Sequence, residues 1–348
     1  MLFYQPVTRF YCGVDLHSSS MYICVFDKVN SEILMHRNIG NDPEYFLKLM
    51  APWAKDLTVA VESTFNWYWL YDYCESEGIR FALAHSLYLK AVNGAKTKND
   101  KIDSEKIARI TAGGTLPLAY AYPREHRSIR DFIRRRNHFV QMRAELLGHI
   151  QCLNMQENNP PLGRATKKLS LRPTIPDNFI DPGVRLSVEA NLEAIQHYDV
   201  IITKMEKEIR KIAYEKKQKE MSLLTTVPGI GDITALIIAY ETHDINRFAG
   251  RQEFCSYSRL IGCEHESGGK KRRSPGSKIG NPHLKWAFSE AAIHSKLNND
   301  RIRKYADKLE TRHKKGVSNA ILAHKIGRAV YYMLKNGTVF DLDKFLKN

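Results

Sequence analysis

The sequence predicts an α/β domain at the N-terminus, a helical arm in the middle and a mostly α-helical C-terminal domain. Short apolar segments follow one another between residues 9 and 85 with the lengths of β-strands. Apolar residues then recur at helical spacing in residues 125–157 and 186–219. The predicted boundaries are 1–120, 121–220 and 221–348.

Five strand-like segments and one helix make up the first region. The segments are RFYCGVDLH, MYICVFDK, EILMHRNI, LTVAVE and IRFALAH. Between the last two, WYWLYDYCESEG has the length of a helix and ends in glycine, which commonly stops one. A meander of strands followed by strand–helix–strand predicts a mixed sheet covered by helices.

The middle region contains two long amphipathic helices around a proline-rich linker. Residues 158–183 hold five prolines and two glycines, which predicts a loop. Two such helices indicate an antiparallel coiled-coil arm or a dimerisation element. Ordinary packing helices explain the pattern equally well.

The third region begins with VPGIG (227–231), which resembles a helix-hairpin-helix turn. Gly229 and Gly231 would let backbone amides approach a phosphate beside a helix N-terminus. An ordinary helix connection is an equal alternative. We expect further helices at 283–296 and 317–335.

The charge of the chain favours a polyanionic partner. Lysine and arginine total 53 against 38 acids, giving +15 and a pI near 9.4. Nucleic acid fits this excess best, with a merely basic soluble enzyme as the alternative, because a membrane surface would also require an apolar anchor beside a basic amphipathic stretch. The start lacks the features of a signal peptide, and no apolar run approaches the roughly 20 residues of a membrane span. Six scattered cysteines without a CxxC pair predict reduced thiols in a cytoplasmic protein, with neither a zinc site nor disulfides.

Four carboxylates occur in an order typical of metal-dependent nucleases. Asp15 ends the first strand, Glu62 ends a later one, and Asp100 and Asp103 open a predicted helix. Such a cluster repels itself unless cations bind, and two Mg²⁺ ions could clamp the attacking and leaving oxygens of a phosphodiester. Taken singly, each acid could instead be a turn, cap or solvated helix residue. The order is similar to that of ribonuclease-H/RuvC sites. Nearby basic residues fit a nucleic-acid backbone: Lys96, Lys98, Lys101 and Lys106.

A basic, glycine-rich segment at residues 264–282 is predicted to be an irregular loop that grips a nucleic-acid backbone. It could also present a hydroxyl, and the residues alone leave Ser267, Ser274 and Ser277 as alternatives. A mobile, solvated loop is the alternative for the whole segment. The basic residues of the wider stretch 265–287 are Lys270, Lys271, Arg272, Arg273, Lys278 and Lys285.

A second basic cluster, Arg134, Arg135 and Arg136, lies on the first helix of the arm. We expect it to contribute electrostatically to nucleic-acid binding. Arg130 and Arg134 lie four residues apart, which suits a helix face along RNA or DNA, although the flank of a coiled coil is an alternative.

Five motifs together resemble a known family. GVDLH, VAVEST, KNDKIDSEKIA, VPGIG and ESGGKKRR…SKIGNPHLKWA occur in the order found in the DEDD insertion-sequence transposases. These transposases form the insertion sequence 110 family, and the DLH and ESTFNWY forms resemble its 1111 subgroup. Pilin-gene invertases belong to the same family. The likeness spans about residues 10–340.

The resemblance implies a RuvC-like (ribonuclease-H-like) α/β N-terminal domain, a helical coiled-coil middle and a C-terminal transposase domain with a nucleophilic serine. Carried over by position, the metal-binding catalytic acids are Asp15, Glu62, Asp100 and Asp103, and the nucleophile is Ser267. It further implies two Mg²⁺ ions, replaceable by Mn²⁺, and homodimers that assemble into tetramers. A structured bridge RNA would pair with donor and target DNA in a bacterial, nucleoid-associated protein.

The sequence therefore predicts a DNA transposase that cuts and rejoins donor and target DNA through Ser267. A RuvC-type endonuclease that hydrolyses DNA junctions is the main alternative, with Ser267 only a loop residue. A third possibility is a non-catalytic nucleic-acid-binding protein with a decayed site, against which the intact set of four acids argues.

Overall fold

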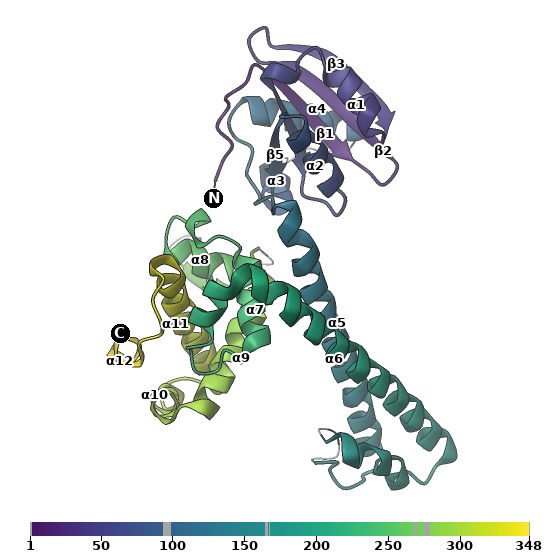
Figure 1. The fold of residues 1–348 in the computed structure, drawn as a ribbon, viewed down its shortest axis with the longest axis vertical. Coiled ribbons are helices and arrows are strands. Elements are labelled where there is room, and N and C mark those ends of the chain that lie inside the picture. The colour runs from purple at the N-terminus through teal and green to yellow at the C-terminus, as the bar shows by residue number, and fades with distance from the viewer. Residues whose placement is uncertain are drawn as a thin grey trace. The chain divides into compact units, whose positions relative to one another are not determined.

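The structure is a computed structural model that describes residues 2–92, 99–163, 166, 168–267, 270–274 and 279–347. Side chains of residues 90–92, 213–214, 263–267 and 270–274 lie outside this description. The contacts divide the chain into two compact units, Met1–Arg124 and Glu125–Asn348 (Figure 1). The division into three domains stays a prediction.

A five-stranded sheet in the order β3-β2-β1-β4-β5 forms the centre of the first unit (Figure 1). The central strand β1 pairs antiparallel with β2 and parallel with β4, and β4 pairs parallel with β5. The five predicted strands and the mixed sheet are therefore confirmed. The strands are β1 (Phe10–Leu16), β2 (Ser20–Asp27), β3 (Glu32–Gly40), β4 (Leu57–Glu62) and β5 (Arg80–Ala84).

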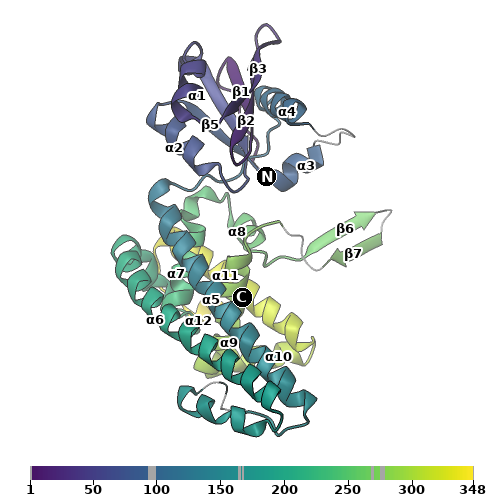
Figure 2. The ribbon, with the colours of Figure 1, turned by 90° about the vertical axis from the view of Figure 1, so that its right-hand side faces the viewer.

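Helices cover both faces of this sheet (Figures 1 and 2). Cys12 and Val14 of β1 belong to the core that contains Phe46 of α1 and Leu70 of α2. The alternate residue Tyr11 faces α4 instead. Helix α1 was not predicted, although Asp42 caps it and Pro43 begins it, a common start signal. The helices are α1 (Pro43–Met50), α2 (Tyr68–Ser76), α3 (Ser86–Val92) and α4 (Asp100–Ala112), with a short 3₁₀ turn at Ala54–Asp56.

Two long helices, α5 (Arg124–Gln156) and α6 (Pro182–Leu224), run antiparallel in the second unit. Arg136 pairs with Glu206 and Arg143 with Asp199, so partner numbers fall along α6 as they rise along α5. The two helices are confirmed, and coiled-coil packing stays a prediction.

The linker between these helices is more ordered than the predicted loop. It forms 3₁₀ turns at Leu169–Thr174 and Pro176–Asn178. Ile175 and Phe179 are buried in one cluster with Ile150 of α5 and Val188 of α6. Prolines prevent a regular α-helix in this linker, but the apolar residues between them still pack against α5 and α6.

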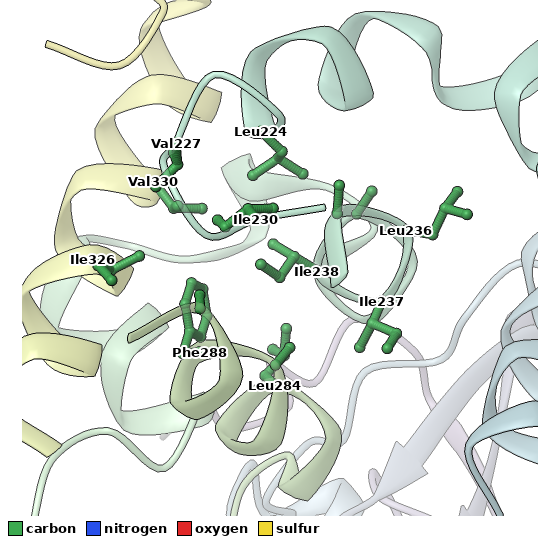
Figure 3. Close-up of a cluster of buried hydrophobic side chains, with 14 of the residues drawn as sticks. Leu224, Val227, Ile230, Leu236, Ile237, Ile238, Leu284, Phe288, Ile326 and Val330 are labelled. Atoms are coloured by element: carbon green, nitrogen blue, oxygen red, sulfur yellow. The ribbon is translucent and has the colours of Figure 1, made fainter. Parts of the chain in front are cut away.

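A helical cluster around one large core completes the second unit (Figure 3). Ile238 of α7, Phe288 of α9 and Ile326 of α11 point into this core. The helices predicted at 283–296 and 317–335 are confirmed as α9 and α11. The helices are α7 (Asp232–Thr242), α8 (Arg251–Tyr257), α9 (Pro282–Asn298), α10 (Asp300–Glu310), α11 (Lys315–Asn336) and α12 (Leu342–Lys347), with a 3₁₀ turn at Ile245–Arg247.

The prediction of an irregular loop at 264–282 is wrong for its first part. Residues Cys263–Ser267 form strand β6 and Lys270–Ser274 form strand β7, paired antiparallel with Ser267 opposite Lys270. Figure 2 shows this hairpin extending from the helices of its unit. Only Gly268 and Gly269 separate the strands, and a Gly-Gly pair is a hairpin signal that the glycine and charge content obscured.

Among the residues that the structure describes, no helix has the length and apolar character needed to cross a bilayer.

Candidate active site

Two carboxylates lie at the edge of the sheet where β1 and β4 end. In the parallel register of these strands Val14 lies opposite Val61. The next residue on each strand is an acid, Asp15 on β1 and Glu62 on β4. Laterally adjacent positions of parallel strands point to the same face, so both carboxylates lie on one face of the sheet.

Helix α4 adds the other two acids to this edge. Tyr11 belongs to one cluster with Ala112, and two residues further along β1 Gly13 lies against Ser104. The helix therefore runs antiparallel to β1, and its first turn lies beside the end of the strand. That turn contains Asp100 and Asp103.

Glycine at position 13 allows this close approach. A Cβ atom there would lie 2.1 Å from the carbonyl oxygen of Ser104 and 2.4 Å from the amide nitrogen of Ala108. Both are backbone atoms of α4, so no side chain can move away to make room. Any larger residue would push α4, and with it the two acids of its first turn, away from Asp15.

His17 joins Asp15 to Asp100. Its Nε2 atom lies 3.6 Å from Asp15 Oδ2 and 3.2 Å from Asp100 Oδ2. One ligand atom from each of these three residues lies within 4.8 Å of the others, a spacing that could hold a metal ion. Lys106 Nζ lies 3.8 Å from Asp103 Oδ1 and forms an ion pair with it.

The acids perturb one another. The pKa of Asp15 is raised, first by burial and then by the charges of Asp100, Asp103 and Glu62, while His17 opposes the rise. A raised pKa means that ionising Asp15 costs free energy in the absence of a cation. Positive charge placed among these oxygens would remove that cost.

The residues present fit a hard divalent cation. Mg²⁺ and similar ions prefer carboxylate oxygens, and the α4 acids sit in a first turn where backbone amides favour negative charge. The cap of this helix is Asn99, whose side chain accepts a hydrogen bond from the Lys101 amide. Among the nearby lysines predicted to contact a nucleic-acid backbone, Lys101 is exposed, whereas Lys96 and Lys98 lie outside the described residues.

His17 is the residue that sequence reasoning missed. Its carbonyl oxygen accepts hydrogen bonds from Asn41 and from Asn66, which follows β4. These bonds tie the segment after β1 to the segment after β4. A signal was available, because His17 follows Asp15 by two residues and so points to the same face of a strand.

Ser267 lies in the other unit, on the last residue of β6. Its side chain and those of Lys270, Lys271, Arg272 and Arg273 lie outside the description, as do Ser277 and Lys278 entirely. The choice of Ser267 as nucleophile and the phosphate-binding role of these cations therefore stay predictions.

The base of the hairpin is held in place by described contacts. The Asn281 amide donates to the Tyr257 carbonyl, and Arg259 donates to the carbonyls of Ile279 and Gly280. Gly280 has a φ of +97°, and a Cβ there would lie 2.7 Å from the Tyr257 carbonyl oxygen. The chain therefore leaves and re-enters the helical cluster at fixed points.

Below this base lies a buried ionic cluster around Glu241, the penultimate residue of α7. Its carboxylate accepts hydrogen bonds from Arg130 and Arg134 of α5 and from Asn281. Burial alone would raise the pKa of Glu241, but Arg134, Arg130 and Asn281 outweigh it and lower the pKa to about 2. Glu241 thus joins α5, α7 and the start of α9.

The predicted basic cluster on α5 is largely engaged within the protein. Arg134 binds Glu241, Arg136 binds Glu206, and Arg135 lies over the ring of Phe139, with 5.9 Å from its guanidinium carbon to the ring centroid. Arg130 also forms an ion pair with Glu241. A role for the three arginines in nucleic-acid binding stays a prediction.

The VPGIG turn connects α6 to α7. Gly229, with a φ of +96°, packs on α9, where a Cβ would lie 2.3 Å from the Ser295 amide nitrogen. Its requirement for glycine is therefore explained by helix packing. Gly231 has open space around it and caps the start of α7. Both glycines line a hollow of about 440 Å³ together with Thr226 and His294, and phosphate binding there stays a prediction.

Known proteins resemble both units. A family model described as a transposase, of the DEDD insertion sequence 110 type, matches residues 12–154. A second, described as the transposase IS116/IS110/IS902 family, matches residues 221–307. The first model contains all four acids, and the second contains the VPGIG turn and the hairpin.

Individual relatives extend the likeness over nearly the whole chain. The transposase for insertion sequence element IS1328 of Yersinia enterocolitica is 23% identical over 336 residues, 94% of this chain and 98% of the relative. The transposase for IS1111A of Coxiella burnetii is 23% identical over 192 residues, 54% of this chain and 52% of the relative. The transposase for IS1533 of Leptospira borgpetersenii is 24% identical over 257 residues, 68% and 70% of the two chains.

Proposed function

The chain belongs to the DEDD transposases of the insertion sequence 110 family, enzymes that act on DNA, and from this premise we propose that it cuts and rejoins donor and target DNA through a covalent serine–DNA intermediate. The observation that carries the proposal is the meeting of Asp15, Glu62 and the first turn of α4 at one edge of the sheet. An edge built in this way suits phosphoryl transfer.

Asp15, Glu62, Asp100 and Asp103 would hold divalent metal, which we propose to be two Mg²⁺ ions, with Mn²⁺ able to replace them. When bound, the ions stabilise negative charge on the attacking and leaving oxygens of a phosphodiester. His17 orients the carboxylates of Asp15 and Asp100 through its Nε2 atom.

In the proposed reaction the hydroxyl of Ser267 loses its proton to water and its Oγ attacks phosphorus. The bond from phosphorus to the 3′-oxygen breaks, and that oxygen takes a proton from water. The product is a serine phosphoester on one DNA end and a free 3′-hydroxyl on the other. Rejoining reverses these steps with a different 3′-hydroxyl, so no ATP is consumed.

We further propose that a structured bridge RNA pairs with donor and target DNA, and that homodimers assemble into tetramers. The net charge of +15 supports a large nucleic-acid partner. Gly231, Lys270–Arg273 and Lys278 are the proposed phosphate contacts. A serine supplied by another subunit is compatible with this arrangement. The bridge-RNA part is tested by the DNA flanking the gene, which should encode a folded non-coding RNA with loops complementary to the insertion junctions.

Incubation with Mg²⁺ and junction DNA tests the chemistry. We expect a covalent adduct that survives denaturation, disappears in Ser267→Ala and persists in the matched control Ser274→Ala. An adduct that persists in Ser267→Ala would show that the nucleophile is another residue.

The competing function is a RuvC-type endonuclease that hydrolyses DNA junctions. One observation favours it: all four acids and His17 belong to the first unit alone, so hydrolysis by water would need no serine. It predicts nicked product without an adduct and near-normal cleavage by Ser267→Ala. A non-catalytic protein would show neither product.

A further inference from the structure

A cavity of about 590 Å³ lies in the second unit, outside every site discussed above. One wall is a face of α11, where Lys325, Arg328 and Tyr332 follow one another at helical spacing. The opposite wall is the segment from Thr338 into α12, and Arg251 at the start of α8 closes one end. The volume lies within the range of pockets that enclose small organic groups.

The rim of this cavity is strongly cationic. Arg251, Lys325, Arg328 and Lys344 line it against a single acid, Asp341. Asp341 is partly engaged, because its carboxylate accepts the Lys344 backbone amide. Beside the cavity the pKa of His324 is lowered, first by burial and then by the charges of Arg328 and Arg251. The charges of the two arginines therefore also act on His324 of α11 itself.

The interior is apolar and aromatic. Tyr332 is 43% exposed in the wall, and its hydroxyl accepts a hydrogen bond from Arg251 at 3.1 Å. Lys325 lies over the ring of Phe345, 5.3 Å from its centroid, and Met333 contributes to the lining. The cavity thus offers a fixed aromatic ring and apolar surface within reach of several cations.

We propose that this cavity binds one unpaired nucleotide of a single-stranded nucleic acid. A nucleotide combines a flat apolar ring with a phosphate, which matches an aromatic wall below a cationic rim. Tyr332 would stack on the base, and Arg328 with Arg251 would contact the phosphate. An acidic peptide fits less well, because α11 uses its own backbone amides and carbonyls and offers no strand edge to pair with.

Binding should be measured on the full chain in EDTA, so that the result does not depend on metal or on DNA cleavage. Fluorescent oligothymidylate and oligouridylate strands serve as the DNA and RNA probes. We expect Arg328→Gln and Tyr332→Ala each to weaken binding about tenfold at low salt, and Tyr332→Phe to bind like the parent because it keeps the ring. The exposed Arg312→Gln, which removes one charge from the same unit, is the matched control and should weaken binding less than twofold.

Photo-crosslinking locates the bound strand. A 5-iodouracil base in either probe should attach to Tyr332, and the peptide map should show this attachment in the parent and not in Tyr332→Ala. Cross-links only outside residues 325–345 would overturn the proposal. So would equal losses for Arg328→Gln and Arg312→Gln, or loss of the Tyr332 cross-link when polyglutamate at equal charge concentration is added before irradiation. A preference for one probe would identify the strand as DNA or RNA.

Discussion

Replacing Glu241 by glutamine should cost the second unit about 3 kcal/mol of stability, because it removes the one negative charge between two arginines. Glu241 is 1% exposed, and its carboxylate receives Arg130, Arg134 and Asn281. Glutamine preserves the shape of the side chain, but its amide group cannot balance two guanidinium charges.

The magnitude follows from the pKa of this carboxyl group. A pKa lowered from 4.5 to about 2 corresponds to a preference of about 3 kcal/mol for the ionised form. Breaking a buried ion pair by removing one partner has a similar cost of about 3–5 kcal/mol. For a unit of this size, about 3 kcal/mol lowers the melting temperature by about 6–12 °C.

Urea unfolding monitored by circular dichroism measures the loss. The matched control is Glu206→Gln, which also removes an arginine partner on the same unit but at a side chain that is 20% exposed, and it should cost about 1 kcal/mol or less. A loss below about 1 kcal/mol for Glu241→Gln would show that the buried arginines are compensated by another group.

The dependence on pH gives a second measurement of the same interaction. The folded pKa lies below the unfolded value, so the stabilisation is complete above about pH 4.5 and is lost as the pH falls towards about 2. The parent should therefore lose stability over this interval more steeply than Glu241→Gln. Parallel curves for the two proteins would refute the assigned charge cluster.

Two further substitutions test the first unit. Asp15→Asn should stabilise the protein in EDTA above the pKa of Asp15, because it removes the charge repulsion that raises this pKa. It should also abolish both the Mg²⁺-induced rise in melting temperature and DNA cleavage. The control is the exposed Asp56→Asn, and an unchanged Mg²⁺ response of Asp15→Asn would show that Asp15 is not a metal ligand. Gly13→Ala should lower the free energy of unfolding by about 2 kcal/mol or more and weaken Mg²⁺ binding, because the added Cβ meets the α4 backbone. The control Gly148→Ala, which has open space around it, should stabilise the protein by about 0.5–1 kcal/mol. Thermal melts with and without Mg²⁺ measure both effects, and an unchanged stability of Gly13→Ala would contradict the close packing of α4 on β1.

The sequence predicted the strands and the acidic edge well because both depend on local patterns. LTVAVE and RFYCGVDLH have the apolar residues of buried strands and end in or near an acid. Parallel pairing of these two strands is then enough to place Asp15 beside Glu62. Only the register of α4 needed the structure, since Gly13 gives no sign of which helix approaches it.

Prediction failed where a residue's role depends on distant partners. Glu241 ends an apolar helix and looks like a solvated terminal acid, yet it is buried by residues 111 and 40 positions away in the chain. The hairpin was missed for a different reason, since its strands carry the charged residues expected of a loop. High charge predicts exposure, and a two-stranded ribbon can be exposed and still be regular.

Internal ion pairs change how the net charge should be interpreted. Arg130, Arg134 and Arg136 contribute to the total of +15 but face Glu241 and Glu206, so a nucleic acid could use them only by breaking internal ion pairs. Breaking the buried pairs of Arg130 and Arg134 with Glu241 costs several kcal/mol, more than a screened phosphate contact returns, whereas the partly exposed pair of Arg136 with Glu206 contributes about 1 kcal/mol or less. Nucleic-acid binding in the second unit should therefore depend on other cations, and among the side chains that the structure describes Arg251 and Arg328 at the cavity are the candidates. Counting charges by location, rather than in total, separates the arginines that hold the unit together from those available to a partner.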